Sequence, residues 1–253
     1  MTDESRIWTA ALIIVGDEIL SGRTQDKNLS QVAVWLGVQG IRLREVRVVP
    51  DIEDAIVEAV NALRSRNDYL FTTGGIGPTH DDITVDSVAR ALGVEVVIHP
   101  KARAVLESYY ETRGGLNEGR LRMARVPAGA DLIENRLSGA PGIKIGNVYL
   151  MAGVPGITAQ MLDGLTGTLE GGLPLLSVTI GCWVAESEVS ELLASTEKAF
   201  HSCQIGSYPF FREGRVGANF VIRSTSEDDM AACAKALETS LAEMGRTPVP
   251  GGI

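Results

Sequence analysis

Three neighbouring carboxylates follow a glycine-rich stretch in the first half of the chain. Asp81, Asp82 and Asp86 come shortly after residues 74–77, which have the sequence Gly-Gly-Ile-Gly. Glycine lets the backbone approach a ligand closely and turn its N–H groups toward it, which is one way that proteins hold phosphates. Carboxylates beside a bound phosphate repel it unless a cation lies between them. The pattern therefore predicts a phosphate site at which one or more of these aspartates is catalytic or binds a metal ion.

The glycine stretch is expected to connect a strand to a helix. Residues 69–73 form a short apolar run typical of a buried strand, and apolar residues recur with helical spacing from 85 to 92. The first 170 residues alternate in the same way, with a continuous apolar strand at 10–15 and a helical pattern at 29–36. Such a βαβαβα series predicts a mainly parallel sheet that is covered by helices on both sides.

Ligands of such sheets bind beyond the carboxyl ends of the strands. Asp17 and Glu18 follow the first strand and Asp51 follows the second, so we expect them to meet the glycine stretch in one crevice. Two interpretations of Asp51 remain open, because Pro-Asp before a helical run is also an ordinary helix start. Asp82 has the same alternative, as a cap of the helix that follows it.

A change of pattern divides the chain into two expected domains. Residues 1–172 form the α/β domain, with a hairpin at 143–151 that adds antiparallel strands to the edge of its sheet. A Gly-Gly-Leu-Pro stretch at 171–174 has the composition of a linker. Residues 175–253 then follow the order βαββα, which predicts a small α+β domain of ferredoxin-like type.

The charge and the cysteines restrict location and partners. The net charge is −9, and residues 173–253 carry 6 basic against 10 acidic residues, so neither domain is basic. We therefore expect no nucleic-acid partner. Cys182, Cys203 and Cys233 are typical of reduced core thiols, and no signal peptide or membrane-spanning run is evident. These features predict a cytoplasmic protein with no membrane partner.

Several of these segments resemble a known family. Residues 16–22 (GDEILSG), Asp26 with Asn28, and residues 73–84 (TGGIGPTHDDIT), 138–142 (SGAPG) and 153–156 (GVPG) occur in family order. They are similar to the MoaB/Mog-type molybdopterin-binding domain, above all to the N-terminal part of competence/damage-inducible protein A (CinA). The resemblance covers roughly residues 8–170, and residues 175–253 look like the small middle domain of that branch. The sequence ends at Ile253, so we do not expect the C-terminal deamidase domain of CinA or its activity.

The resemblance implies a three-layer α/β/α sandwich and assigns the catalytic work to Asp51 and Asp82. The expected metal ligands are Asp17, Glu18, Asp81 and Asp82. The expected phosphate- or ligand-binding residues are Gly16, Ser21, Asn28, Thr73, Gly74, Gly75, Gly77, Pro78, Thr79, Ser138, Pro141, Gly153 and Pro155.

Because a side chain at Gly75 would block a phosphate, Gly75→Val is expected to abolish ligand binding without unfolding the protein.

The implied activity is metal-dependent hydrolysis of a nucleotide pyrophosphate such as ADP-ribose or FAD, with Mg²⁺, Mn²⁺ or Co²⁺. The sequence offers no convincing Ser–His or Cys–His pair, which favours direct attack by water. One alternative is a molybdopterin carrier or adenylyltransferase in molybdenum cofactor synthesis, and another is a non-catalytic regulatory module. The partner is a small nucleotide or pterin, and the resemblance also implies a homo-oligomer.

Overall fold

The structure is a computed structural model that describes residues 6–253. It divides into two compact units between Gly172 and Leu173, within the stretch that has the composition of a linker. No helix within residues 6–253 has both the length and the apolar character needed to cross a bilayer.

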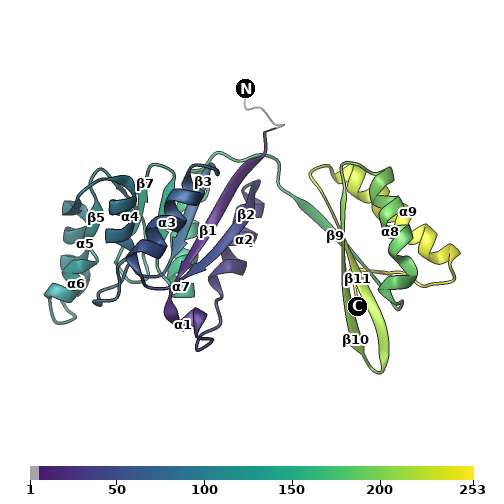
Figure 1. Cartoon of the computed structure of the whole chain (residues 1–253), viewed down its shortest axis with the longest axis horizontal. Coiled ribbons are helices and arrows are strands. Elements are labelled where there is room, and N and C mark those ends of the chain that lie inside the picture. Colours follow the sequence, from purple (N-terminus) through teal and green to yellow (C-terminus); the bar gives the residue numbers. More distant parts are fainter. Residues whose placement is uncertain (1–5) are drawn as a thin grey trace. The chain divides into compact units, whose positions relative to one another are not determined.

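Unit 1, which ends at Gly172, is built around a six-stranded sheet (Figure 1). Unit 1 as a whole contains the strands β1 (Trp8–Val15), β2 (Ile41–Val49), β3 (Tyr69–Thr73), β4 (Val96–Ile98), β5 (Arg125–Pro127), β6 (Asp131–Ile133), β7 (Gly142–Ile145) and β8 (Val148–Met151). Its helices are α1 (Asp17–Leu20), α2 (Asn28–Val38), α3 (Glu53–Arg64), α4 (Thr84–Leu92), α5 (Pro100–Tyr110), α6 (Glu118–Arg122) and α7 (Pro155–Leu165).

The sheet has the strand order β2-β1-β3-β8-β7-β6 and is mainly parallel. Strand β1 pairs in parallel with β2 and β3, and β3 pairs in parallel with β8. The predicted hairpin is present, since β7 pairs antiparallel with β8 and the turn between them has Gly146 at φ 56°. Strands β4 and β5 form a separate two-stranded sheet that the sequence did not predict.

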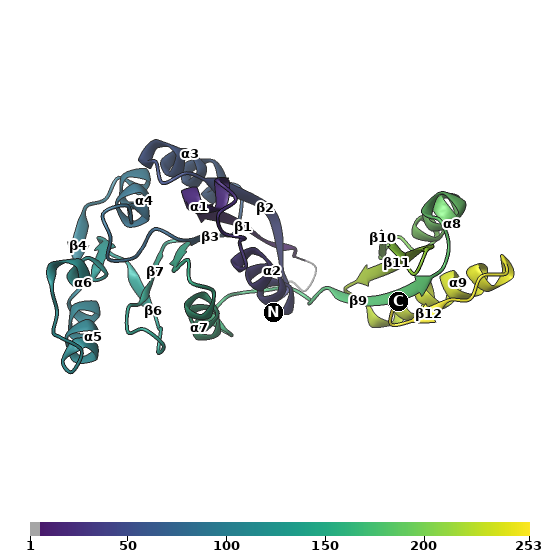
Figure 2. The same cartoon turned by 90° about the horizontal axis from the view of Figure 1, so that it is seen from below.

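Helices cover both faces of the large sheet, so the predicted three-layer sandwich is confirmed. Alternate side chains of β1 enter two different cores, with Ile13 packing on the side of α3 and α4 and Leu12 on the side of α2 and α7. Figure 2 shows α3 and α4 above the sheet and α2 and α7 below it. Because β1 is buried on both faces, its sequence is continuously apolar rather than alternating.

Unit 2, which runs from Leu173 to Ile253, is the small α+β domain that the sequence predicted. Its elements are β9 (Leu176–Cys182), α8 (Glu186–Ala199), β10 (Gln204–Arg212), β11 (Arg215–Ser224), α9 (Glu227–Glu243) and β12 (Val249–Pro250). The strands form one antiparallel sheet in the order β10-β11-β9-β12. The two-residue strand β12, which the sequence did not predict, completes the βαββαβ order of ferredoxin-like domains.

Candidate functional site

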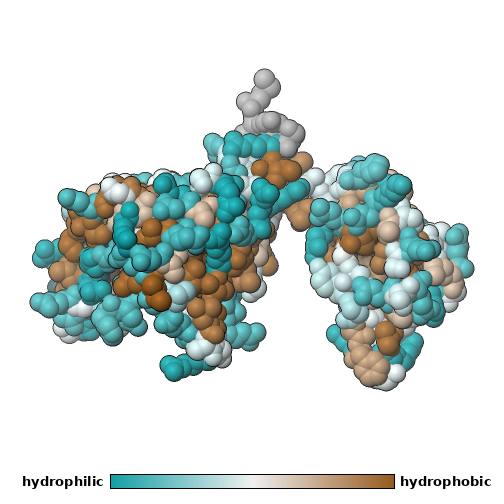
Figure 3. Space-filling view, in the orientation of Figure 1, coloured by the Kyte–Doolittle hydropathy of each residue, from teal (hydrophilic) through white to brown (hydrophobic). Residues whose placement is uncertain are grey.

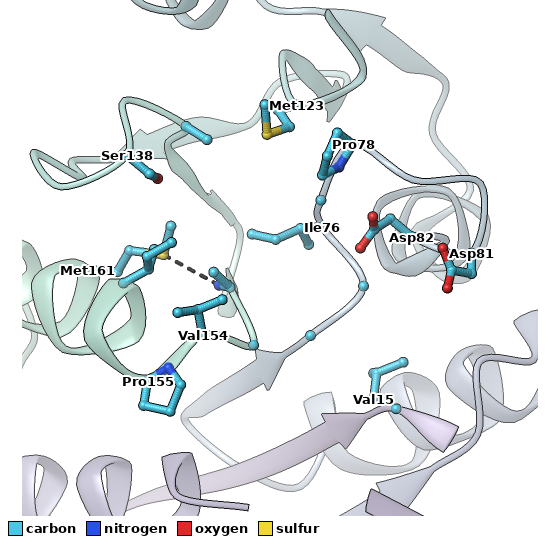
Figure 4. A pocket seen from close by; sticks show the side chains of 18 of the residues that line it. Val15, Ile76, Pro78, Asp81, Asp82, Met123, Ser138, Val154, Pro155 and Met161 are labelled. Carbon is cyan, nitrogen blue, oxygen red and sulfur yellow. Dashed lines mark hydrogen bonds between the residues drawn. The ribbon is translucent and has the colours of Figure 1, made fainter. Parts of the chain in front are cut away.

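The carboxyl ends of the parallel strands of unit 1 surround one pocket of about 660 Å³. The segments after β1, β2, β3 and β8 all contribute to its lining, as expected for an open parallel sheet. Backbone hydrogen bonds hold two of these segments together: the N–H of Gly16 donates to the carbonyl of Val49 (3.1 Å), and the N–H of Gly74 donates to that of Met151 (3.1 Å). Figure 4 shows the pocket between the glycine loop and the start of α7.

The glycine loop after β3 needs glycine for its own packing. Gly74 and Gly75 have φ values of 97° and 67°, in the left-handed region that side chains disfavour. A Cβ on Gly75 would lie 2.1 Å from the hydroxyl of the buried Thr84, and one on Gly74 would lie 2.2 Å from the carbonyl of Val15. We therefore expect Gly75→Val to lower the stability of unit 1 in addition to any effect on ligand binding, because the new side chain would collide with Thr84.

Asp82 stands at one wall of the pocket, facing the glycine loop (Figure 4). Its carboxylate accepts a hydrogen bond from the backbone N–H of Thr79 (2.8 Å) and another from the Thr79 hydroxyl. Helix α4 begins at Thr84 and has no side-chain cap at the preceding residue, so the capping interpretation of Asp82 is wrong. A Cβ on Gly77 would lie 2.6 Å from the Asp82 carboxylate, so glycine at 77 leaves room for that group.

Asp51 connects the ends of two strands. Its Oδ2 accepts a hydrogen bond from the backbone N–H of Asp17 (2.9 Å), which ties the segment after β2 to the segment after β1. Helix α3 begins at Glu53 without a side-chain cap, so the capping interpretation of Asp51 is also wrong. Burial raises the pKa of Asp51, and the negative charges of nearby Glu18 and Asp81 raise it further, whereas the hydrogen bond from Asp17 lowers it.

The raised pKa of Asp51 predicts a stabilising substitution. Because the folded state disfavours the ionised carboxylate, Asp51→Asn should raise the melting temperature at pH 7 in the absence of divalent ions; the amide oxygen can still accept the hydrogen bond from Asp17. The gain should shrink as the pH falls through the raised pKa and should be absent below about 4, where the unfolded chain also binds the proton. Thermal unfolding between pH 4 and 8 measures the difference, and a lower melting temperature for Asp51→Asn at pH 7 would contradict the argument.

The pocket is acidic and has no cationic side chain in its lining within the part of the chain that the structure describes. Glu18, Asp51, Asp81 and Asp82 all contribute to its walls. Within residues 6–253, no three His, Cys, Asp or Glu side chains form a preassembled metal site. Mg²⁺ is commonly held by one or two carboxylates together with water and substrate phosphates, so these carboxylates fit a hard divalent ion that binds jointly with a phosphate.

An apolar wall adjoins the glycine loop. Tyr110, Met123 and Met161 contribute to it together with Ile76 of the loop itself, and Figure 4 shows Ile76, Met123 and Met161 around the same space. The guanidinium of Arg120 lies 4.2 Å from the centre of the Tyr110 ring and supports it from α6. Acidic residues and glycines beside an apolar wall suit a ligand that has a phosphate group and a planar ring.

Most of the predicted ligand-binding residues come together in this pocket. Those that line it are Gly16, Gly74, Gly75, Gly77, Pro78, Ser138, Pro141, Gly153 and Pro155. Those that do not are Ser21, Asn28, Thr73 and Thr79; Asp17, an expected metal ligand, does not line it either.

The residues outside the main pocket have other contacts. The Ser21 hydroxyl donates to the carbonyl of Glu18 (3.3 Å), at the end of α1. Asn28 is buried, and its Nδ2 donates to the carbonyl of Gly153 (2.7 Å). Asn28 and the buried Thr73 instead line a smaller neighbouring pocket, which also includes Glu18, Gly153 and Pro155.

Other predicted candidates are used structurally. Asp86 forms an ion pair with Arg125, with Oδ2 accepting from Nη1 at 3.1 Å, and neither side chain lines the pocket. None of the basic residues from 101 to 125 lines it either. Conversely, Tyr110 and Met123 line the pocket although no sequence signal marked them as site residues.

Comparisons with known proteins identify a sequence family for each of the two units. The sequence family described as a probable molybdopterin binding domain matches residues 11–171, and the one described as the FAD synthase middle domain matches residues 174–248. The chain belongs to the molybdopterin-binding domain family. A relative from Aeropyrum pernix that carries no descriptive name is 32% identical over 257 residues, which cover 94% of this chain and 93% of the relative.

Within this molybdopterin-binding family, the similarity extends to CinA. A CinA-like protein from Citrifermentans bemidjiense is 33% identical over 86% of this chain, which spans only 54% of that relative's length. The crystal structure of CinA from Thermoplasma acidophilum, described as of unknown function, has a TM-score of 0.59 at 33% identity and covers 63% of this chain and 96% of that one. The predicted resemblance to the N-terminal domain of CinA is thus confirmed.

Proposed function

We propose that the chain is a metal-dependent hydrolase that cleaves the pyrophosphate of a nucleotide such as ADP-ribose or FAD. The main observation behind this proposal is that the pocket contains both the glycine loop and four carboxylates, those of Glu18, Asp51, Asp81 and Asp82. No cationic side chain of the described residues lines that pocket. A pyrophosphate would be repelled there unless a divalent cation came with it. The match of unit 2 to the FAD synthase middle domain supports a ligand of the FAD type.

In this proposal, different residues of the pocket bind the phosphate, the ring and the metal ion. Backbone N–H groups of the glycine loop hold one phosphate, and the apolar wall at Ile76 and Tyr110 receives a planar ring. Asp82, with Glu18 and Asp81 nearby, would hold Mg²⁺, Mn²⁺ or Co²⁺. Such an ion neutralises charge at the phosphoryl group and provides a water of lowered pKa. Asp51, with its raised pKa, is suited to accept a proton from an attacking water.

The direct test is to incubate the purified protein with ADP-ribose, FAD or NAD, each with Mg²⁺, Mn²⁺, Co²⁺ or EDTA, and to follow AMP release. Release that requires a divalent ion supports the proposal. The family description favours a second candidate, a molybdopterin carrier or adenylyltransferase that uses the same pocket. No AMP release from any substrate, together with tight binding of molybdopterin, would favour that candidate instead.

The aromatic wall yields a prediction about substrate affinity. Tyr110→Ala should raise the KM for the cleaved nucleotide by about tenfold, because stacking of a base on an aromatic ring contributes roughly 1–3 kcal/mol. Tyr110→Phe is the matched control, since it keeps the ring and its contact with Arg120 and should leave the KM nearly unchanged. Steady-state kinetics of all three proteins decide the point, and equal KM values for wild type and Tyr110→Ala would show that the ring of the substrate does not bind there.

A further inference from the structure

Unit 2 has one sheet face that its helices do not cover. Ile180, Phe220 and Ile222 point toward α8 and α9 and form the core of the unit. Because side chains alternate along a strand, Tyr208, Phe210 and Arg212 of β10 lie on the opposite face, as does Arg223 of β11. Figure 1 shows that the β10–β11 hairpin extends beyond the two helices.

The Phe210 and Tyr208 rings of this face lie against glycines of the sheet. A Cβ on Gly217 would lie 2.5 Å from the ring of Phe210, and one on Gly206 would lie 3.0 Å from the ring of Tyr208. The two glycines thus provide space for the rings, and the outer side of the Tyr208 ring remains accessible, since the residue is 47% exposed. Trp183, just after β9, contacts Phe210 edge-on with ring centres 5.4 Å apart. The result is a platform of three aromatic side chains.

Three arginines lie over the rings of the platform. The guanidinium carbons of Arg215, Arg212 and Arg223 are 4.3, 5.0 and 5.8 Å from the ring centres of Trp183, Phe210 and Tyr208, respectively. Arg223 also donates to the Tyr208 hydroxyl (2.6 Å). Within the described part of the chain, none of the three forms an ion pair with a carboxylate. Their N–H groups therefore remain free of competing carboxylates.

Charge is segregated between the two sides of unit 2. Nine of its ten acidic residues lie on α8 and α9, and only Glu213 lies in the hairpin. The strands themselves carry arginines and no acidic residue. At physiological salt, charges separated by more than about 8 Å are largely screened from each other. The net negative charge of unit 2, from which the sequence analysis expected no nucleic-acid partner, is thus the sum of an acidic helix side and a sheet side that carries arginines.

We propose that this platform binds single-stranded nucleic acid, with unpaired bases stacked on the exposed Tyr208 ring and on the guanidinium planes over Phe210 and Trp183, and with phosphates bound by the arginines. Stacking on aromatic rings or guanidinium planes requires bases that are not paired in a duplex, and the arginine charges complement those of the phosphates. The site is centred on β10 and β11, because Ile253 packs over Gly181 of β9 and hydrogen-bonds through its backbone N–H to Asn219 (2.9 Å). The proposal does not depend on the activity of unit 1.

Fluorescence anisotropy with a fluorescein-labelled oligouridylate of about ten nucleotides tests the proposal on the whole chain in about 50 mM salt. The double substitution Arg212→Gln/Arg215→Gln should raise the Kd at least tenfold. It should also make the slope of log Kd against log salt concentration shallower by about 1.4, because each contacted phosphate of a single strand contributes about 0.7 to that slope. Tyr208→Ala should raise the Kd by about tenfold. The matched control, Lys198→Gln/Lys235→Gln, removes the same charge from the helices and should change the Kd less than twofold. Circular dichroism confirms that each variant is folded.

Three outcomes would overturn the proposal. The first is no saturable binding of the oligonucleotide, and the second is an equal loss of binding in the arginine and lysine double variants. The third is competition by AMP as effective as that by unlabelled oligonucleotide, because that would show a site for one nucleotide rather than for a strand. Sedimentation of the free protein is a further check: self-association that is lost in Tyr208→Ala would assign the platform to a second copy of the chain instead.

Discussion

Asp82→Asn is expected to lower turnover of the pyrophosphate substrate by about 100-fold or more, in line with the loss of one stabilising group at a reacting centre. The substitution keeps the size of the side chain, and the amide oxygen can still accept the hydrogen bonds that Thr79 donates. Only the charge is lost. The helix that follows needs no cap from this residue, so the melting temperature should change by less than a few degrees.

Asp131→Asn is the matched control for this prediction. It makes the same change of charge in unit 1, at an exposed residue that does not line the pocket, and AMP release should be unaffected. A divalent-ion titration adds a second readout, because Asp82→Asn should require more metal for half-maximal activity if its carboxylate holds the ion. Near-normal AMP release by Asp82→Asn would remove Asp82 from the mechanism and shift the catalytic role to Asp51 or Asp81.

The glycine loop and the strand ends were predictable because their signals are local. A parallel sheet follows from the alternation of apolar strands and helices, and it brings the residues after β1, β2 and β3 to the same edge. The capping interpretations failed because the hydrogen-bond partners of the carboxylates are not in the following helix. Asp51 bonds to Asp17, 34 residues earlier in the chain, and Asp82 bonds backward to Thr79.

The apolar wall was not predictable in the same way. Tyr110 and Met123 lie between β4 and β5, outside every motif on which the predicted site was based, and tertiary packing alone brings them to the pocket. The short strands β4 and β12 have three and two residues, which is too few for a periodic pattern to be visible. Likewise, residue counts could not show that the acidic residues and the strand arginines of unit 2 occupy opposite sides.

Gly75→Val is expected to destabilise unit 1 strongly, whether or not a ligand binds. A β-branched residue at φ 67° carries a backbone strain of about 1–3 kcal/mol, and its Cβ would overlap the hydroxyl of Thr84. Thr84 is fully buried and donates to the carbonyl of Gly74 (2.9 Å), so it cannot move without breaking the loop. Overpacking of this kind adds roughly 1–3 kcal/mol, a large part of the roughly 5–15 kcal/mol that stabilises a typical domain.

Gly93→Val is a control that distinguishes the backbone strain of Gly75→Val from its steric clash with Thr84. Gly93 has nearly the same backbone angle, φ 69°, but a Cβ there would meet no atom within 4 Å. Both variants therefore carry the backbone strain, and only Gly75→Val carries the clash with Thr84. Thermal unfolding should show a fall in melting temperature of about 10 °C for Gly75→Val and about half of that for Gly93→Val. If both variants were equally stable and only Gly75→Val lost ligand binding, glycine at position 75 would be required by the phosphate and not by Thr84.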